Sequence, residues 1–127
     1  MRYAVIIDDS RETAESLGKM LKLLGYEVSI ALGPRRGLES MTRRLPDVIF
    51  LDIHMQGVEG TEICRYIRRD PRTASVPVVV ISSDTQETMI AQVREAGATA
   101  FIPKPIGLET LERTLQDLES PPEPGLS

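Results

Sequence analysis

Apolar residues gather in short uninterrupted runs that are separated by longer amphipathic stretches. The three strongest runs, at 3–7, 48–51 and 76–81, are rich in β-branched residues and do not alternate with polar ones. Such runs are typical of strands covered on both faces, as in a parallel sheet. Two weaker runs, at 27–31 and 99–103, bring the predicted number of strands to five.

Each amphipathic stretch carries apolar residues at the three- and four-residue spacing of a helix face, which predicts five helices. The apolar positions are Ala14, Leu17, Leu21 and Leu24; Leu38, Met41 and Leu45; Ile63 and Ile67; Met89, Ile90 and Val93; and Leu108, Leu111, Leu115 and Leu118. Gly25 and Gly97 stand where a helix would end before a strand. Asp9 and Glu12 have the spacing of a capping box for the first helix.

Strict alternation of strands and helices predicts right-handed crossovers and an α/β fold, a doubly wound five-stranded parallel sheet with helices on both faces. We expect the flavodoxin-like strand order 2-1-3-4-5, in which ligands bind at the carboxyl ends of the first and third strands. The domain should span residues 1–119. Residues 120–127 are rich in proline and should form a disordered tail or the stub of a linker.

The chain has 127 residues, enough for one domain with a substantial core. Its net charge of −4 and its scattered arginine pairs favour solvated helix faces over a nucleic-acid surface, because phosphate binding requires clustered positive charge. We expect neither a membrane span nor a signal segment. Cys64 is the only cysteine, so it should be a small helix hydrophobe in a reducing, cytoplasmic protein.

Polar residues follow directly after the predicted strands; they are Asp8, Asp9, Asp52, Ser82, Ser83 and Lys104. Because the carboxyl ends of parallel strands meet at one edge of a sheet, we expect these side chains to lie together. Three carboxylates at close range raise one another's pKa unless a cation compensates, and hard oxygen ligands suit Mg²⁺. The lysine and hydroxyls could then bind a phosphoryl group, and an aspartate masked by metal could attack phosphorus to give an acyl phosphate.

Each of these residues also has an ordinary structural explanation. The aspartates could be a helix cap and the start of a turn, and the serines, or Asp84, could cap the fourth helix. Lys104 lies between two prolines and could be an exposed loop lysine. Each explanation is adequate alone, but the coincidence of all these residues at one sheet edge favours a functional site.

Four segments, "VIIDDS", "VIFLDIHMQGVEGTEICRYIR", "VPVVVISS" and "AFIPKP", occur in this order. Together they resemble the response-regulator receiver domain of two-component signalling, the family of the chemotaxis response regulator. The similarity extends from about residue 2 to residue 119. It implies a phosphoacceptor domain of a phosphorelay rather than a turnover enzyme.

The resemblance assigns roles to the acidic residues and the lysine. Asp52 would accept the phosphoryl group from a phosphohistidine. Asp9, Asp52 and the main-chain carbonyl of His54 would bind Mg²⁺ directly, and Asp8 would act largely through water. Lys104 would pair with the acceptor carboxylate and then with the phosphoryl group.

The resemblance also implies a switch. Ser82 would move toward the phosphoryl group, the backbone N–H of Ser83 would bind it, and Phe101 would turn inward. The Lys104–Pro105 bond would be cis. The face formed by the fourth helix, fifth strand and fifth helix would then change.

The implied partners are a sensor histidine kinase or histidine phosphotransfer protein and a downstream effector domain or protein. Homodimerisation on phosphorylation is left open, and no nucleic acid or membrane is expected as a partner of this domain.

Three other functions are compatible with parts of the sequence. A degenerate receiver would serve only for docking or dimerisation, although here all the key positions are filled. A haloacid-dehalogenase-type phosphatase would need an acid two residues after Asp52, where the chain has His54. A flavodoxin-like FMN carrier would need a phosphate loop after the first strand, where "DDSRET" carries carboxylates. His54 and Asp84 correspond to positions beside the path of the attacking water, and we expect them to contact each other and slow hydrolysis; otherwise His54 is an exposed loop imidazole.

Overall fold

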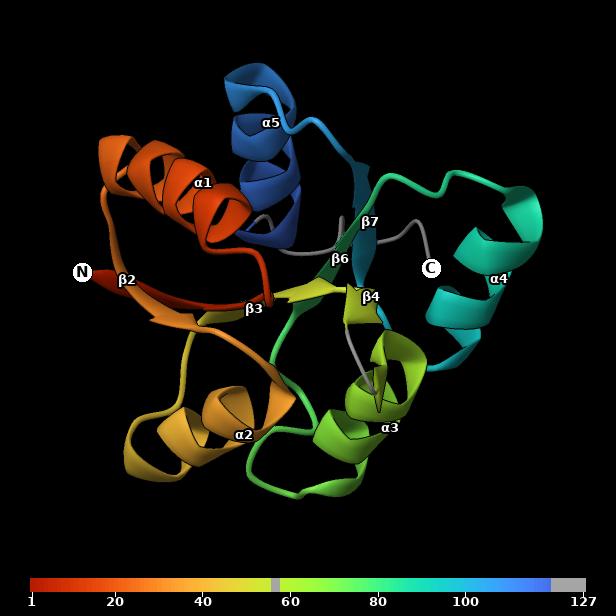
Figure 1. The fold of residues 1–127 in the computed structure, drawn as a ribbon. Helices are drawn as coiled ribbons and strands as arrows, with labels where there is room; N and C mark the ends of the chain where they lie inside the picture. Colours follow the sequence, from red (N-terminus) through yellow and green to blue (C-terminus); the bar gives the residue numbers. More distant parts are fainter. Residues whose placement is uncertain (56–57, 120–127) are drawn as a thin grey trace, which may run out of the picture.

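A five-stranded parallel sheet forms the centre of the molecule (Figure 1). The computed structural model describes residues 1–55 and 58–119, so the predicted proline-rich tail at 120–127 lies outside the described residues. The strands of this sheet are β1 (Arg2–Ile7), β2 (Tyr26–Ala31), β3 (Val48–Asp52), β6 (Val78–Ser82) and β7 (Ala100–Pro103). They lie in the order β2-β1-β3-β6-β7. Counted along the chain this is 2-1-3-4-5, which confirms the predicted flavodoxin-like order.

Helices connect the strands and cover both faces of the sheet (Figure 1). They are α1 (Arg11–Leu23), α2 (Pro34–Arg43), α3 (Gly60–Arg69), α4 (Glu87–Glu95) and α5 (Leu108–Glu119). One apolar cluster joins the sheet to α1 and α5, and the other joins it to α2, α3 and α4. No helix within 1–55 and 58–119 has both the length and the apolarity needed to cross a bilayer.

The two clusters explain why the strand sequences are continuously apolar. In β1, Val5 and Ile7 pack against α2 and α3, whereas Ala4 and Ile6 pack against α1 and α5. All four side chains are fully buried. A strand that is covered on both faces has no position for a solvated side chain, and each buried methylene contributes about 0.8 kcal/mol. Cys64 is also fully buried, as expected of a small helix hydrophobe.

The glycine predictions are confirmed, but the predicted capping box is wrong. Gly25 and Gly97 have φ angles of 92° and 112°, the left-handed region that ends a helix. The N-cap of α1 is Ser10, whose Oγ accepts a hydrogen bond from the Thr13 backbone N–H at 3.4 Å. The helix therefore begins one residue later than a cap at Asp9 would require.

Two apolar positions and one pair of strands also differ from the prediction. Leu45 and Leu108 are 47% and 43% exposed, because Leu45 lies beyond the end of α2 and Leu108 is the first residue of α5. A short antiparallel pair, β4 (His54–Met55) and β5 (Val58–Glu59), follows β3 and was not predicted. Strands of two residues carry too few side chains to show a period.

Candidate functional site

The register of β1 and β3 places two carboxylates at the same edge of the sheet. Ile7 lies opposite Leu51 in this parallel pair, so the chain reaches Asp8 and Asp52 at the same level. Both carboxylates are removed from solvent: Asp8 is 0% exposed and Asp52 is 5% exposed. Neighbouring buried carboxylates repel each other and lose hydration, so this edge of the sheet requires a compensating cation.

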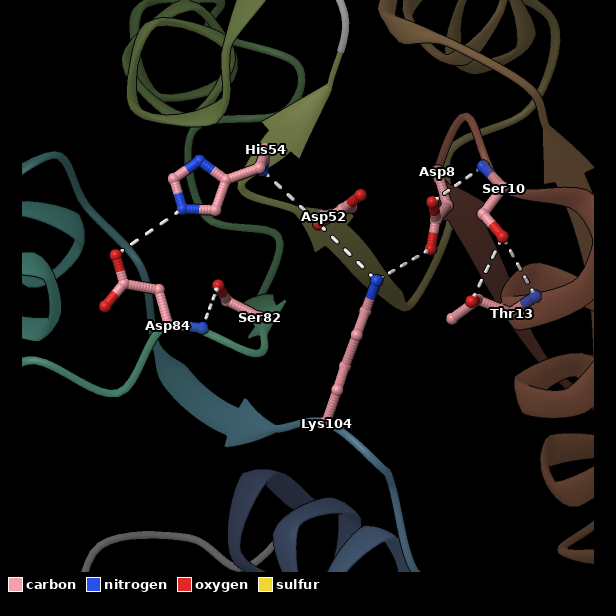
Figure 2. Close-up of polar contacts among 8 residues, drawn as sticks. All are labelled: Asp8, Ser10, Thr13, Asp52, His54, Ser82, Asp84 and Lys104. Atoms are coloured by element: carbon pink, nitrogen blue, oxygen red, sulfur yellow. Dashed lines mark hydrogen bonds and ion pairs between the residues drawn. The ribbon is translucent and has the colours of Figure 1, made fainter.

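The register of β6 and β7 brings that cation. Ser82 lies opposite Pro103, and the backbone N–H of Lys104 donates to the Ser82 carbonyl oxygen at 2.9 Å. The side chain of Lys104 then extends between the two carboxylates (Figure 2). Its Nζ is 3.5 Å from Asp8 Oδ2 and 3.6 Å from Asp52 Oδ1. Lys104 is therefore no exposed loop lysine, and the Lys104–Pro105 peptide bond is cis, as the resemblance implied.

The carboxylates of Asp8, Asp9 and Asp52 form a cluster that could hold a metal ion. Each offers one oxygen, and the three oxygens all lie within 4.8 Å of one another. Asp9 is exposed, whereas the other two are buried, so an ion would be reached from solvent on one side. Hard carboxylate oxygens in a partly open site fit Mg²⁺, which keeps several of its water ligands.

The ionisation of Asp52 reflects this setting. Its pKa is raised from 3.8 to about 6, first by burial and then by the negative charge of Asp8. The Lys104 ammonium and the His54 backbone N–H, which donates to Asp52 Oδ1 at 3.3 Å, act in the opposite direction. Burial and the Asp8 charge together outweigh the Lys104 ammonium, so the ionised form of Asp52 is disfavoured and a further cation would stabilise it.

Asp8 is held in place by the turn that starts α1. Its Oδ1 accepts a hydrogen bond from the Ser10 backbone N–H at 2.9 Å, and Ser10 in turn caps the helix (Figure 2). Ser10 is not among the predicted site residues. The signal was available, because an aspartate commonly accepts from the backbone N–H two residues later and serine is a favoured N-cap.

The residues after β6 do not cap α4, so that alternative explanation is wrong. The N-cap of α4 is Gln86, and it makes no side-chain cap hydrogen bond. Ser82 is 1% exposed, and its Oγ accepts a hydrogen bond from the Asp84 backbone N–H at 3.0 Å. Ser83 is exposed and, with Lys104, lines a hollow of about 510 Å³ beside α1. Ser82 at the end of β6 and Ser83 at the start of the β6–α4 loop therefore both lie at the edge that carries the carboxylates.

His54 and Asp84 contact each other at the mouth of the site. The imidazole points toward the Asp84 carboxylate, with 3.6 Å between Nε2 and Oδ2 (Figure 2). The contact that we expected between these residues is therefore present, and His54 is only half exposed.

Phe101 lies on β7 opposite Val80, partly buried against the cluster under α3 and α4.

Sequence comparison identifies the family. The family model described as the response regulator receiver domain matches residues 4–116. Protein PilH of Pseudomonas aeruginosa is 31% identical over 115 residues, which cover 91% of this chain and 95% of PilH. Response regulator PleD of Caulobacter vibrioides is 36% identical over 102 residues, which cover 80% of this chain but only 22% of PleD.

Structural comparison agrees. The chemotaxis protein CheY4 of Vibrio cholerae has a TM-score of 0.88 and 28% sequence identity, with 93% of this chain and 98% of the CheY4 chain covered. The chain thus spans nearly the whole of PilH and CheY4 but about a fifth of PleD. With the family model matching residues 4–116 and PilH matching over 91% of this chain, the chain belongs to the receiver-domain family of two-component response regulators.

Proposed function

We propose that this domain accepts a phosphoryl group on Asp52 from a phosphohistidine of a sensor histidine kinase or a histidine phosphotransfer protein. One observation carries the proposal: the Lys104 ammonium lies 3.6 Å from Asp52 Oδ1, beside three acidic oxygens within 4.8 Å of one another. This arrangement offers a nucleophilic carboxylate, a mobile positive charge and a cation site at one point.

Asp9, Asp52 and the main-chain carbonyl of His54 would hold Mg²⁺ directly, and Asp8 would act through water. The fit depends on the donor set, which is made of hard carboxylate oxygens that all lie within 4.8 Å of one another. When bound, Mg²⁺ supplies positive charge that holds Asp52 ionised and draws in phosphoryl oxygens.

In the transfer step, an Asp52 oxygen forms a bond to phosphorus while the bond from phosphorus to the donor imidazole nitrogen breaks. The bonding electrons stay with that nitrogen. Asp52 must be ionised to attack, and a pKa of about 6 leaves it mostly ionised at neutral pH. Lys104 can follow the developing charge because its ammonium already lies between two carboxylates, at 3.5 and 3.6 Å.

The phosphorylated state would be read out through β6 and β7. The phosphoryl group adds nearly two negative charges and three acceptor oxygens, which attract the Ser82 hydroxyl and the Ser83 backbone N–H. Phe101 lies one strand away from this loop and would fill the space that is vacated. The face of α4, β7 and α5 would then change in a two-state shift that a downstream effector recognises.

The test is mass measurement after incubation with acetyl phosphate and Mg²⁺. We expect a phosphoryl mass increase in the wild type, none in Asp52→Asn, and an undiminished increase in Asp117→Asn. Asp117 is a matched control because it is an exposed aspartate on α5, outside the acidic cluster. A wild type that gains no mass, or an Asp52→Asn variant that gains as much as the wild type, would contradict the assignment.

A further inference from the structure

Arg68, near the C-terminal end of α3, places a cation among backbone carbonyls instead of beside a carboxylate. It forms no ion pair with any residue in 1–55 and 58–119, although other arginines do. Its Nε donates to the Gly97 carbonyl at 2.9 Å, and one terminal nitrogen donates to the Val76 and Ala74 carbonyls at 2.7 and 3.2 Å. The other terminal nitrogen donates to Thr99 Oγ1 at 3.2 Å.

These bonds tie the end of α4 to α3. Gly97 directly follows the C-cap of α4, so Arg68 satisfies a carbonyl at that helix terminus and adds positive charge where the helix dipole is negative. Packing there is tight, since a Cβ on Gly97 would lie 2.6 Å from Arg68 Cγ. Thr99 is fixed in turn, because its Oγ1 accepts from the Val78 backbone N–H at 3.1 Å.

The other end of α4 is connected to the candidate site instead. Ser82 Oγ accepts from the Asp84 N–H, and Asp84 Oδ1 accepts from the Gln86 N–H at 3.1 Å. Gln86 is the N-cap and makes no side-chain cap bond. Val93, in the second half of the helix, is the only α4 residue that is fully buried. In the first turn, Met89 is only partly buried against the cluster under α3 and α4, so this end is held by that contact and by the loop hydrogen bonds that begin at Ser82.

We propose that Arg68 is the anchor of a pivot, so that activation swings the N-terminal end of α4 while its C-terminal end stays fixed on α3. This inference rests on the proposed function, because the movement begins when Ser82 turns toward a phosphoryl group and gives up its bond from the Asp84 N–H. A nine-residue helix is about 13 Å long, so a tilt of about 10° moves its first turn by about 2 Å. Arg68 acts through the α4–β7 turn, 29 residues away in sequence, and is a positioning residue.

The test is hydrogen–deuterium exchange, followed by mass spectrometry, on the whole chain with and without Mg²⁺ and beryllofluoride, a phosphoryl mimic. In the wild type, exchange should change in segment 83–90 on beryllofluoride and stay unchanged in segment 96–99. The amides of 96–99 all donate to backbone carbonyls at 2.8–3.0 Å, so they are suitable reporters. In Arg68→Met, exchange at 96–99 should rise at least about tenfold, the factor for losing one hydrogen bond from a charged group such as this guanidinium.

Two further variants make the result specific. Arg69→Met is the matched control, because Arg69 is exposed and makes no ion pair within the described part of the chain; its exchange at 96–99 should match the wild type. Arg68→Lys keeps the charge but has fewer donors, so exchange at 96–99 should lie between that of the wild type and that of Arg68→Met. If Arg68→Met does not fold, exchange at 96–99 in Arg68→Lys should still exceed that of the wild type. In Arg68→Met, beryllofluoride should alter exchange at both ends of α4.

Unchanged exchange at 96–99 in Arg68→Met, or a wild type in which 96–99 responds to beryllofluoride as much as 83–90, would overturn the pivot. Failure of the proposed function looks different. In that case the wild type shows no phosphoryl mass increase and no response to beryllofluoride anywhere, while the basal exchange of Arg68→Met still reports whether the anchor exists.

Discussion

Replacing Asp52 by Asn should stabilise the metal-free domain at neutral pH. The folded carboxyl keeps its proton up to a pKa of about 6, whereas in the unfolded chain it has its ordinary pKa of 3.8. Between these values the unfolded state binds fewer protons, so the free energy of unfolding of the wild type falls as pH rises. Asparagine is close in shape to aspartate but does not titrate, so the variant does not lose stability in this way as pH rises.

The magnitude follows from the same two values. At about 1.4 kcal/mol per pKa unit, the difference between 3.8 and about 6 corresponds to about 3 kcal/mol. The advantage of Asp52→Asn over the wild type should therefore be small below pH 4 and should grow to about 3 kcal/mol above pH 7. Asp52 is 5% exposed, so solvent screens this effect little.

Urea denaturation at pH 4 and pH 7.5, without divalent metal and followed by circular dichroism, measures the difference directly. Carboxylates distant from Asp52 titrate equally in both proteins and cancel. Addition of Mg²⁺ at pH 7.5 should stabilise the wild type and narrow the gap, because an ion that binds only the folded state raises the free energy of unfolding. A gap of the same size at both pH values, or an Asp52→Asn variant less stable than the wild type at pH 7.5, would contradict the raised pKa of Asp52 in the folded state.

Three other predictions concern the surroundings of Asp52. Lys104→Met should raise the pKa of Asp52 further, since the ammonium lowers it, and NMR titration of the carboxyl measures this; an unchanged pKa would contradict the ion pair. Alanine at His54 or Asp84 should speed loss of the phosphoryl group by no more than about fivefold, as a partly exposed pair contributes at most about 1 kcal/mol. Phosphoryl lifetimes equal to that of a Glu87→Ala control would argue against a barrier to water. Gly60→Ala should lower the free energy of unfolding by about 2 kcal/mol or more, because its Cβ would lie 2.6 Å from Ile53 Cα; urea denaturation without loss of stability would count against this.

Much of the fold could be predicted from the local pattern of apolar residues, and each missed feature has a local physical reason. β1, β3 and β6 were predicted because each is buried on both faces and must be apolar throughout. β6 begins at Val78, two residues later than expected, since Pro77 has no N–H to donate to the ladder. The β4–β5 pair was missed because strands of two residues show no period, and the Ser10 cap was missed because a single hydrogen bond defines it.

The candidate site shows the same division. Asp8, Asp52 and Lys104 were expected together from the rule that parallel strand ends share one edge, and in the structure the Lys104 ammonium lies within 3.6 Å of both carboxylates. Arg68 and Arg69 form one of the scattered arginine pairs that were predicted to lie on solvated helix faces. Its acceptors are mainly carbonyl oxygens, which every residue carries, so no sequence pattern could distinguish it from the exposed Arg69.

By itself, the sequence determined the α/β class, the strand order and which polar residues would follow the strands, because central strands buried on both faces leave polar side chains only at their ends. Tertiary structure alone decided how strongly the pKa of Asp52 rises, that His54 meets Asp84, and that Arg68 binds the end of α4. Those features depend on desolvation and on distances of a few ångströms between residues far apart in the chain. Such distances exist only once the helices have packed onto the sheet.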